Sequence, residues 1–324
     1  MTAIGYALSS EEHAPLDLVR HAAMAEEAGF SFALISDHFH PWIERQGNSP
    51  FVWGVLGAIA HATEQLEIGT GVTCPTMRTH PAIIAHASAT AAALMPGRFF
   101  LGVGTGENLD EHILGDGWPD WEIRAEMLEE AVGIIRDLWT GEEVSHRGEY
   151  YLVRNAKLYT PPPELPAIYV AGSGPDAARL AGRIGDGFIG TGPEQEVLEA
   201  YRDGGGDGPR YGQVTVCWAA SEQEARKTAL EWWPNAAIHG EATVELPSPK
   251  HFEQLTSDVT EEQIAKAIPC GPEPEVHLKA IREYLDAGYD HVYIHQVGPD
   301  QAGFLEFARR ELLPELEPAT AGRR

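Results

Sequence analysis

Short β-rich segments alternate with helical segments along almost the whole chain, and this alternation constrains the fold more than any other feature. Eight segments have the length and composition of strands, and helical patterns separate most of them. The expected strands are 4–8, 32–36, 66–72, 99–104, 167–172, 186–192, 213–220 and 291–297. Eight strand-and-helix units in one chain are typical of a TIM (β/α)8 barrel. We therefore expect an α/β barrel.

The segments between the strands give the expected helices and the domain boundaries. The helices are 15–28, 51–63, 81–94, 121–139, a short one from 176, 221–232, 260–267, 274–287 and 301–313. A doubly wound sheet is the alternative, but it normally carries one glycine-rich turn after its first strand. Here the informative residues follow several strands, which favours the barrel.

We expect a single barrel domain over residues 1–316, interrupted by two insertions and followed by a loose tail at 317–324. The first insertion, at about 142–162, alternates around Arg147-Gly148 and is predicted to be a β-hairpin. The second, at about 234–272, is expected to be irregular apart from the helix at 260–267.

Charge and cysteine content exclude several classes of protein. The chain has 49 acidic and 23 basic residues, a net charge of −26, so nucleic acid and anionic membranes are poor partners. Its 3 cysteines are scattered, which argues against a disulfide scaffold or a Cys metal site, and we expect no metal. No apolar run is long enough to span a membrane and no signal pattern opens the chain, so we expect a cytoplasmic protein. The acidic, lysine-poor composition fits a salt-loving source and an ordinary acidic enzyme equally well.

Polar and ionisable residues gather directly after several expected strands, which is where a barrel carries its chemistry. The segment SDHFHPW at 36–42 places His38 beside Asp37 and Trp42 at the end of the second strand. An imidazole titrates near neutral pH and can accept the proton of an alcohol. A single histidine among 14 is more often a surface or core residue. Its place at a strand end nevertheless makes His38 the best candidate base.

Two glycine-rich turns supply further candidates. GTGEN at 104–108 places Glu107 on a turn that can approach a ligand closely. A closed site would raise the pKa of this carboxyl group, whereas in water it would be an ordinary loop carboxylate. GSGP at 172–175 precedes a helix whose free N–H groups suit a phosphate, although alone this signal is weak. GVGTG at 102–106 lacks the spacing of a dinucleotide fingerprint, so we expect no use of NAD or NADP.

Four segments together carry a resemblance to a known family. They are SDHFHPW at 36–42, GTGVTCPT at 69–76, RFFLGVGTGE at 98–107, and YVAGSGP through AGRIGDGF at 169–188. On these segments the chain resembles the luciferase-like flavin and deazaflavin oxidoreductases. Within them it is most similar to the branch typified by the deazaflavin-dependent glucose-6-phosphate dehydrogenase. The similarity covers about residues 1–195 and returns weakly near the last strand.

The resemblance implies coenzyme F420 as cofactor, with FMN as the alternative, a small-molecule substrate and a homodimer. It implies that His38 takes the hydroxyl proton, that Trp42 flanks the reacting centre and that Glu107 serves the pyrimidine side of the deazaflavin. It also implies a bulge at Gly71-Val72, through a non-proline cis peptide, against the cofactor. The other implied cofactor contacts are Asp37, Thr105, Gly106, Asp110, Ala171, Gly172, Ser173 and Gly174, and the implied substrate contacts are Glu11, Thr191 and Glu194.

The chain departs from that branch where the branch binds a sugar phosphate. Two lysines and an arginine of the branch fall on Glu194, Thr243 and Ala267, none of which is basic. Arg78 and Arg98 remain as bases that could reach the pocket. We therefore expect an uncharged or weakly polar alcohol, ketone or sugar rather than glucose 6-phosphate.

Two further departures concern cofactor contacts. An Asn of the branch is Asp110 here, and a Ser in the bulge is Gly71. Two alternative functions stay open: an FMN-dependent monooxygenase of the same superfamily, and a non-catalytic flavin-binding protein. The joint presence of His38, Trp42 and Glu107 favours the F420-dependent oxidoreductase.

Overall fold

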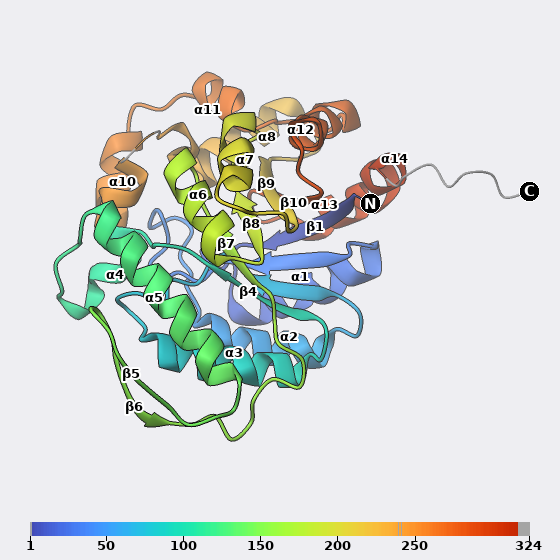
Figure 1. The fold of residues 1–324 in the computed structure, drawn as a ribbon. Helices are drawn as coiled ribbons and strands as arrows, with labels where there is room; N and C mark the ends of the chain where they lie inside the picture. The colour runs from blue at the N-terminus through green and yellow to red at the C-terminus, as the bar shows by residue number, and fades with distance from the viewer. Residues whose placement is uncertain (1, 239, 241, 317–324) are drawn as a thin grey trace, which may run out of the picture.

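A computed structural model describes residues 2–238, 240 and 242–316 of the chain, and its centre is a closed barrel of eight parallel strands. The strands run in the order β1-β10-β9-β8-β7-β4-β3-β2 around the barrel (Figure 1). Their bounds are β1 Ala3–Leu8, β2 Phe32–Ile35, β3 Glu67–Thr70, β4 Phe99–Val103, β7 Ile168–Ala171, β8 Gly187–Gly190, β9 Arg210–Val216 and β10 His291–Gln296. The barrel and all eight strands predicted from the sequence are confirmed.

Long helices surround the barrel, and many of them begin and end where the sequence places proline and glycine. Proline occupies the first turn of α1 (Pro15–Ala28), α3 (Pro81–Leu94), α6 (Pro175–Ile184) and α12 (Pro274–Ala287). Proline suits this position because the first N–H groups of a helix have no partner within it. The other helices around the barrel are α2 Val52–Ala62, α5 Trp121–Trp139, α7 Gln195–Asp203, α8 Glu222–Trp232 and α13 Gln301–Phe307.

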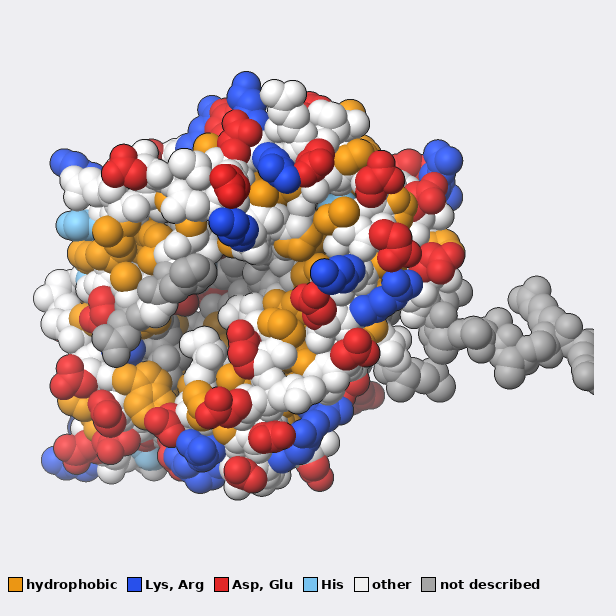
Figure 2. Space-filling view, turned by 90° about the horizontal axis from the view of Figure 1, so that it is seen from above, with side chains coloured by type: hydrophobic (Ala, Val, Ile, Leu, Met, Phe, Trp, Pro, Cys, Tyr) orange, Lys and Arg blue, Asp and Glu red, His pale blue; other side chains and the backbone are white. Residues whose placement is uncertain are grey.

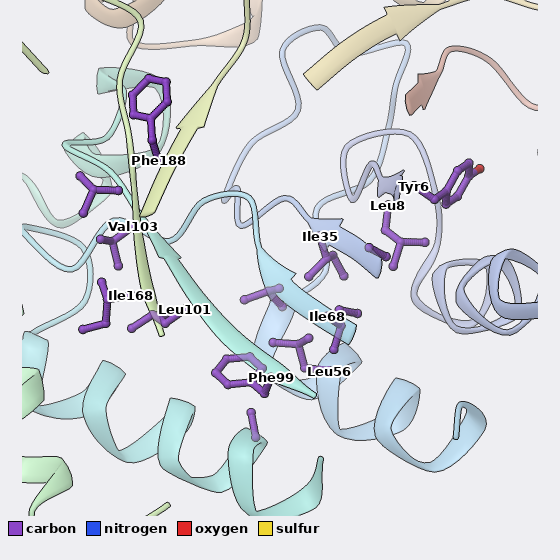
Figure 3. Packing of buried hydrophobic residues seen from close by; sticks show 14 of the residues in the cluster. Tyr6, Leu8, Ile35, Leu56, Ile68, Phe99, Leu101, Val103, Ile168 and Phe188 are labelled. Carbon is purple, nitrogen blue, oxygen red and sulfur yellow. The ribbon is translucent and has the colours of Figure 1, made fainter. Parts of the chain in front are cut away.

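Two hydrophobic layers hold this arrangement together. The larger lies between the barrel and its helices, and Figure 3 shows part of it, where Leu56 of α2 approaches Ile68 of β3 and Phe99 of β4. The smaller fills the barrel, with Phe32, Leu34, Phe100, Ile189, Tyr211 and Tyr293. Glycine makes room for these rings, since a Cβ on Gly69 would lie 2.0 Å from the Phe100 ring. The barrel is therefore a packed core, and a ligand site must lie at one of its ends.

The segments between the barrel units partly match the predictions. The hairpin of β5 (Val144–Arg147) and β6 (Leu152–Ala156) is antiparallel, as predicted, and lies outside the barrel. Helix α11 (Glu261–Ala267) is also confirmed. The prediction that the rest of 234–272 is irregular is wrong, because it contains α9 (Ala242–Glu245) and α10 (Pro249–Thr256). Helix α7 was not predicted at all.

The remaining short elements lie in loops and at the C-terminal end. They are α4 Asn108–Glu111, the 3-10 turns His112–Leu114 and Pro234–Ala237, the π-helical turn Ala308–Leu312 and α14 Leu313–Leu316. The predicted loose tail at 317–324 lies outside the described residues. Within the described part of the chain, every helix is too short or too polar to cross a membrane.

Candidate active site

A cavity of about 440 Å³ opens at the carboxyl ends of the barrel strands. Its wall includes residues that follow β1, β2, β3, β4 and β7, which is the face where barrels of this kind carry their chemistry. The volume lies within the range of small-molecule sites. The predicted residues that line it are Glu11, Asp37, His38, Trp42, Gly71, Val72, Thr105, Gly106, Glu107, Asp110, Ala171, Gly172, Ser173 and Thr191.

Two of the residues named from the sequence lie just outside this cavity. Glu194 lines a smaller recess of about 120 Å³, which shares Gly172, Ser173 and Thr191 with the main cavity. Gly174 is the residue before α6 and is not part of the wall. The structure therefore brings most of the predicted set together around one cavity.

His38 lies among carboxylates at the wall of the cavity. Its side chain is 11% exposed, with Nδ1 3.0 Å from Asp110 Oδ2 and Nε2 3.6 Å from Glu11 Oε1. Burial opposes protonation of the ring, but the negative charges of Asp110, Glu11 and Glu107 outweigh it and raise the pKa of His38 to about 9. These three carboxylates therefore favour the protonated form of the ring over the neutral one.

Glu11 is fixed by hydroxyl groups from two strand ends. Ser36 Oγ donates to Glu11 Oε2 at 2.5 Å, and Ser9 Oγ donates to the same oxygen at 3.1 Å. Burial works against its ionised form, yet nearby His38 and these hydrogen bonds lower the pKa of Glu11. Glu11 therefore presents a carboxylate to the cavity beside Nε2 of His38.

Glu107 differs from Glu11, because its pKa is raised and not lowered. Burial raises its pKa to about 7, although the nearby positive charge of His38 works in the other direction. The neighbouring carboxylates of Asp110 and Glu111 add to the increase. A group of this pKa can hold a proton or release it at neutral pH, which suits proton exchange with a bound ligand.

Asp37 and Arg78 mainly support the wall. Asp37 Oδ2 accepts a hydrogen bond from Thr73 Oγ1 at 2.7 Å, and its Oδ1 lies 3.1 Å from Arg78 Nη2. Arg78 also pairs with Glu111 at 3.3 Å. Arg98 lies at the other end of β3, where its Nη1 donates to the Leu66 carbonyl at 2.8 Å. Of the two bases named from the sequence, Arg98 is far from the cavity and Arg78 is already paired.

Backbone features shape another part of the cavity wall. The Gly71–Val72 peptide bond is cis, as predicted. A Cβ on Gly71 would lie 2.9 Å from Leu34 Cβ, and one on Gly104 would lie 2.9 Å from Val72 Cγ2. Gly106 has a φ of +81°, and a Cβ there would lie 2.6 Å from Cys74 Sγ. Glycine is therefore needed at these three positions, because a larger residue would collide with the neighbouring side chains.

The start of α6 offers a place for an anion. Gly174 precedes the helix, and no side chain hydrogen-bonds to this end among the described residues. The first N–H groups of a helix point outward and carry a partial positive charge, which favours a phosphate. Ser173 and Ala177 beside them line the cavity.

Several wall residues were missed from the sequence. His295 lies near the end of β10, one residue before the strand ends, and lines the cavity with Nε2 2.9 Å from Glu12 Oε2. Its place at a strand end is a signal by which the sequence could have located it. Arg124 comes from the first turn of α5, with a side chain only 3% exposed, and no strand end points to it. Phe252 of α10 packs edge-on against Trp42, with ring centroids 5.1 Å apart.

Comparisons with known proteins agree with this geometry. The family model described as "Luciferase-like monooxygenase" matches residues 1–291. The chain is 37% identical, over 98% of both chains, to a protein named F420-dependent glucose-6-phosphate dehydrogenase from Beutenbergia cavernae (strain ATCC BAA-8). It is 38% identical, over 96% of both chains, to the protein of the same name from Nakamurella multipartita (strain ATCC 700099).

A solved structure extends the likeness to three dimensions. It is an F420-dependent secondary alcohol dehydrogenase in complex with an F420–acetone adduct. The two chains superpose with a TM-score of 0.89 at 29% identity, covering 96% of this chain and 98% of the other. The similarity therefore extends over nearly the whole length of both chains.

Proposed function

The chain belongs to the luciferase-like monooxygenase family, and from this we propose that it is a coenzyme F420-dependent oxidoreductase. It transfers a hydride between F420 and an alcohol, sugar or carbonyl substrate. The observation that carries the proposal is His38 on the cavity wall, with Nε2 beside Glu11 and Glu107 nearby. A proton donor or acceptor at this place is what the oxygen of an alcohol or carbonyl requires.

The residues present fit such a cofactor. Glycines leave one wall of the cavity without side chains, so that a flat ring can approach the backbone. The uncapped start of α6 suits the cofactor's phosphate. Bound F420 supplies a two-electron hydride donor or acceptor that activates oxygen poorly. We propose Gly71, Val72, Thr105, Gly106 and Ala171 as its wall contacts, and Gly172, Ser173 and Gly174 as contacts near its phosphate.

The protein's own residues then bind, orient and move a proton. His38 exchanges its proton with the substrate oxygen at Nε2, while Trp42 packs on the ring with centroids 5.1 Å apart and limits its rotation. Glu107 exchanges a proton with the cofactor side of the cavity. Glu11 and Thr191 contact the substrate, and Glu194 lies close enough to reach a long one from the adjoining recess.

Titration of the purified protein with F420 and with FMN tests the function. Binding of F420, followed by a change in its absorbance when an alcohol is added, is the expected result. FMN binding with oxygen consumption would instead indicate a monooxygenase. Tight binding of either cofactor without turnover of any alcohol, sugar or ketone would indicate a non-catalytic binding protein.

The substrate is predicted to be uncharged or weakly polar, because the cavity offers a phosphate little positive charge. Thr243 lines the cavity without a charge, and Ala267 is exposed and not part of its wall. Arg124 is the lining arginine, and Glu245 lies 3.8 Å from its Nη1. An unpaired phosphate buried here would cost several kcal/mol.

Steady-state kinetics with glucose 6-phosphate and with neutral alcohols in one buffer check this prediction. We expect a much lower kcat/KM for the phosphate than for the best alcohol. A value for glucose 6-phosphate above about 10⁴ M⁻¹s⁻¹, which is ordinary for a native substrate, would contradict it. Arg124→Gln then separates the two explanations, since it should abolish that activity only if Arg124 binds the phosphate.

Assembly and location are further proposals. We propose a cytoplasmic homodimer, built from a single barrel domain over 1–316 with insertions at about 142–162 and 234–272. The three cysteines are free and buried, which is compatible with a reducing compartment. Light scattering on the purified protein measures the mass directly, and a monomer mass near 35.3 kDa would contradict the dimer.

A further inference from the structure

Asp110 is fixed to the loop that carries His38. It lies in α4, and its side chain is 3% exposed. Its Oδ1 accepts hydrogen bonds from the backbone N–H groups of Phe39 at 2.7 Å and His40 at 2.8 Å. Both donors directly follow His38 in the chain. These bonds orient the carboxylate and leave Oδ2 free for another partner.

That partner is the ring of His38. Oδ2 lies 3.0 Å from Nδ1, and neither atom has an aligned hydrogen bond to any other group among the described residues. The ring N–H does not point along the line between the two atoms, so the contact is primarily ionic. A buried carboxylate oxygen and a buried ring nitrogen that face each other stabilise a proton on the nitrogen.

Other charged groups around the ring act in the same direction, with one exception. Glu11 Oε1 lies 3.6 Å from Nε2. Glu107 is also close, since one side-chain nitrogen or oxygen atom from each of His38, Glu107 and Asp110 lies within 4.8 Å of those of the other two. Arg78 opposes protonation of the ring, but its charge is shared with Asp37 and Glu111. The net environment of the imidazole is therefore negative.

We propose that Asp110 is a positioning residue that holds His38 as an imidazolium at neutral pH. In the resting enzyme His38 can then donate a proton to a carbonyl substrate. This rests on the proposed F420-dependent function. As a hydride from reduced F420 reaches the carbonyl carbon, the C=O π bond breaks and the oxygen takes the proton from Nε2. The product is an alcohol, the cofactor is left oxidised after its second hydrogen leaves as a proton by way of Glu107, and His38 takes up one proton from water, so that no net proton is consumed beyond the two hydrogens of the reduced cofactor.

An asparagine in place of Asp110 would give the ring a different neighbour. Its amide oxygen can accept the same two backbone N–H bonds, but the atom facing Nδ1 would be an N–H donor. An amide NH₂ group in this place carries no negative charge and turns its N–H groups toward the ring, so the imidazolium loses its ionic partner at Nδ1. The single exchange of oxygen for NH₂ thus changes the preferred charge of His38 with little change of shape.

Histidine titration in the cofactor-free protein tests the proposal directly. We would follow the imidazole resonances by NMR in the wild type, in Asp110→Asn and in the exposed control Asp116→Asn, assigning His38 as the resonance missing in His38→Gln. We expect a wild-type midpoint well above 7, a decrease of more than one pH unit in Asp110→Asn, and no change in Asp116→Asn. A wild-type midpoint below 7 would overturn the proposal, and this measurement does not depend on the folding of Asp110→Asn.

The pH dependence of kcat/KM is the second readout. Reduction of a ketone by reduced F420 should decline above the His38 midpoint, and oxidation of the alcohol should rise to the same midpoint. Both midpoints should move to lower pH in Asp110→Asn. Equal losses in both directions with unchanged midpoints would show a merely structural role and contradict the proposal. Absence of F420 binding, with the NMR midpoints as expected, would refute the proposed function but not the Asp110–His38 coupling.

Discussion

The chemistry of the site depends most on one side chain, His38. Replacing it with alanine should lower kcat by about 10²–10⁴-fold, the usual contribution of a positioned acid or base. The dissociation constant of F420 should change little, since the ring acts on the substrate oxygen. Rapid-mixing and steady-state kinetics with the same alcohol measure the first effect, and a binding titration measures the second.

The matched control is His61→Ala, which removes an exposed histidine in the last turn of α2, away from the cavity. It should leave both quantities unchanged. If His38→Ala turned over at a rate near that of the wild type, another group would have to exchange the substrate proton, and His295 on the same wall would be the next residue to test.

At this scale the sequence could locate residues better than it could assign their neighbours. His38 and Glu107 could be located because strand ends of a barrel converge on one face, and Glu11 was located through the family resemblance. The partner of Asp110 was not foreseen: the resemblance implied a cofactor contact, whereas its carboxylate faces the His38 ring. Arg124 was missed because it reaches the cavity from a helix. Such pairings depend on how loops fold over the barrel, which periodicity does not encode.

Among the secondary-structure elements, α6 is the one whose start we propose as the site of the cofactor's phosphate. Gly174 has extended backbone angles, and a Cβ added there would have open space around it. Gly174→Glu should therefore fold normally and place a carboxylate at the start of the helix. This charge would compete with the cofactor's phosphate for the same N–H groups.

We expect Gly174→Glu to raise the dissociation constant of F420 at least about tenfold, which corresponds to about 1.4 kcal/mol. Gly174→Gln, with the same size and no charge, is the control and should have a much smaller effect. The melting temperature of the cofactor-free variant should be unchanged or higher, because an anion stabilises a helix start. Equal effects of both variants would indicate steric obstruction instead of competition for the phosphate site.

The elements that the sequence did not predict share a physical reason. Helix α7 follows Gly192 and Pro193, has no side-chain cap, and buries a short face that includes Val197 and Tyr201. Helix α10 is only eight residues long, and it is stabilised by its Phe252, which packs against Trp42 of another loop. Short helices are marginal in isolation and are fixed by tertiary contacts. The eight strands could be predicted because each repeats one hydrophobic pattern.

For the whole molecule, the excess of acidic residues is the dominant electrostatic feature. Figure 2 shows acidic side chains spread over one face, with basic ones between them. Several surface pairs form, such as Arg183 with Glu129 at 2.7 Å and Arg179 with Asp176 at 2.7 Å. With 49 acidic against 23 basic residues, however, more than half of the carboxylates have no basic counterpart. Repulsion between them should destabilise the folded state in dilute buffer.

Salt should therefore stabilise this protein. Between 0.01 M and 1 M ionic strength the screening length falls from about 30 Å to about 3 Å, which removes most repulsion between exposed carboxylates. Surface ion pairs are also weakened, but each contributes only about 0–1 kcal/mol and they are outnumbered. We expect the melting temperature to rise by at least about 3 °C in NaCl, since 1 kcal/mol corresponds to about 2–4 °C in a protein somewhat smaller than this one. Calorimetry over a NaCl series measures the change.

A charge-reversal variant separates screening from other effects of salt. Glu196, Glu199 and Glu283 are exposed and form no ion pair among the described residues. Replacing all three with lysine changes the net charge from −26 to −20. The variant should melt higher than the wild type at 0.01 M NaCl and gain less on addition of salt. An equal gain in both proteins would mean that salt acts through hydration of the apolar surface, and the stability would not be limited by charge.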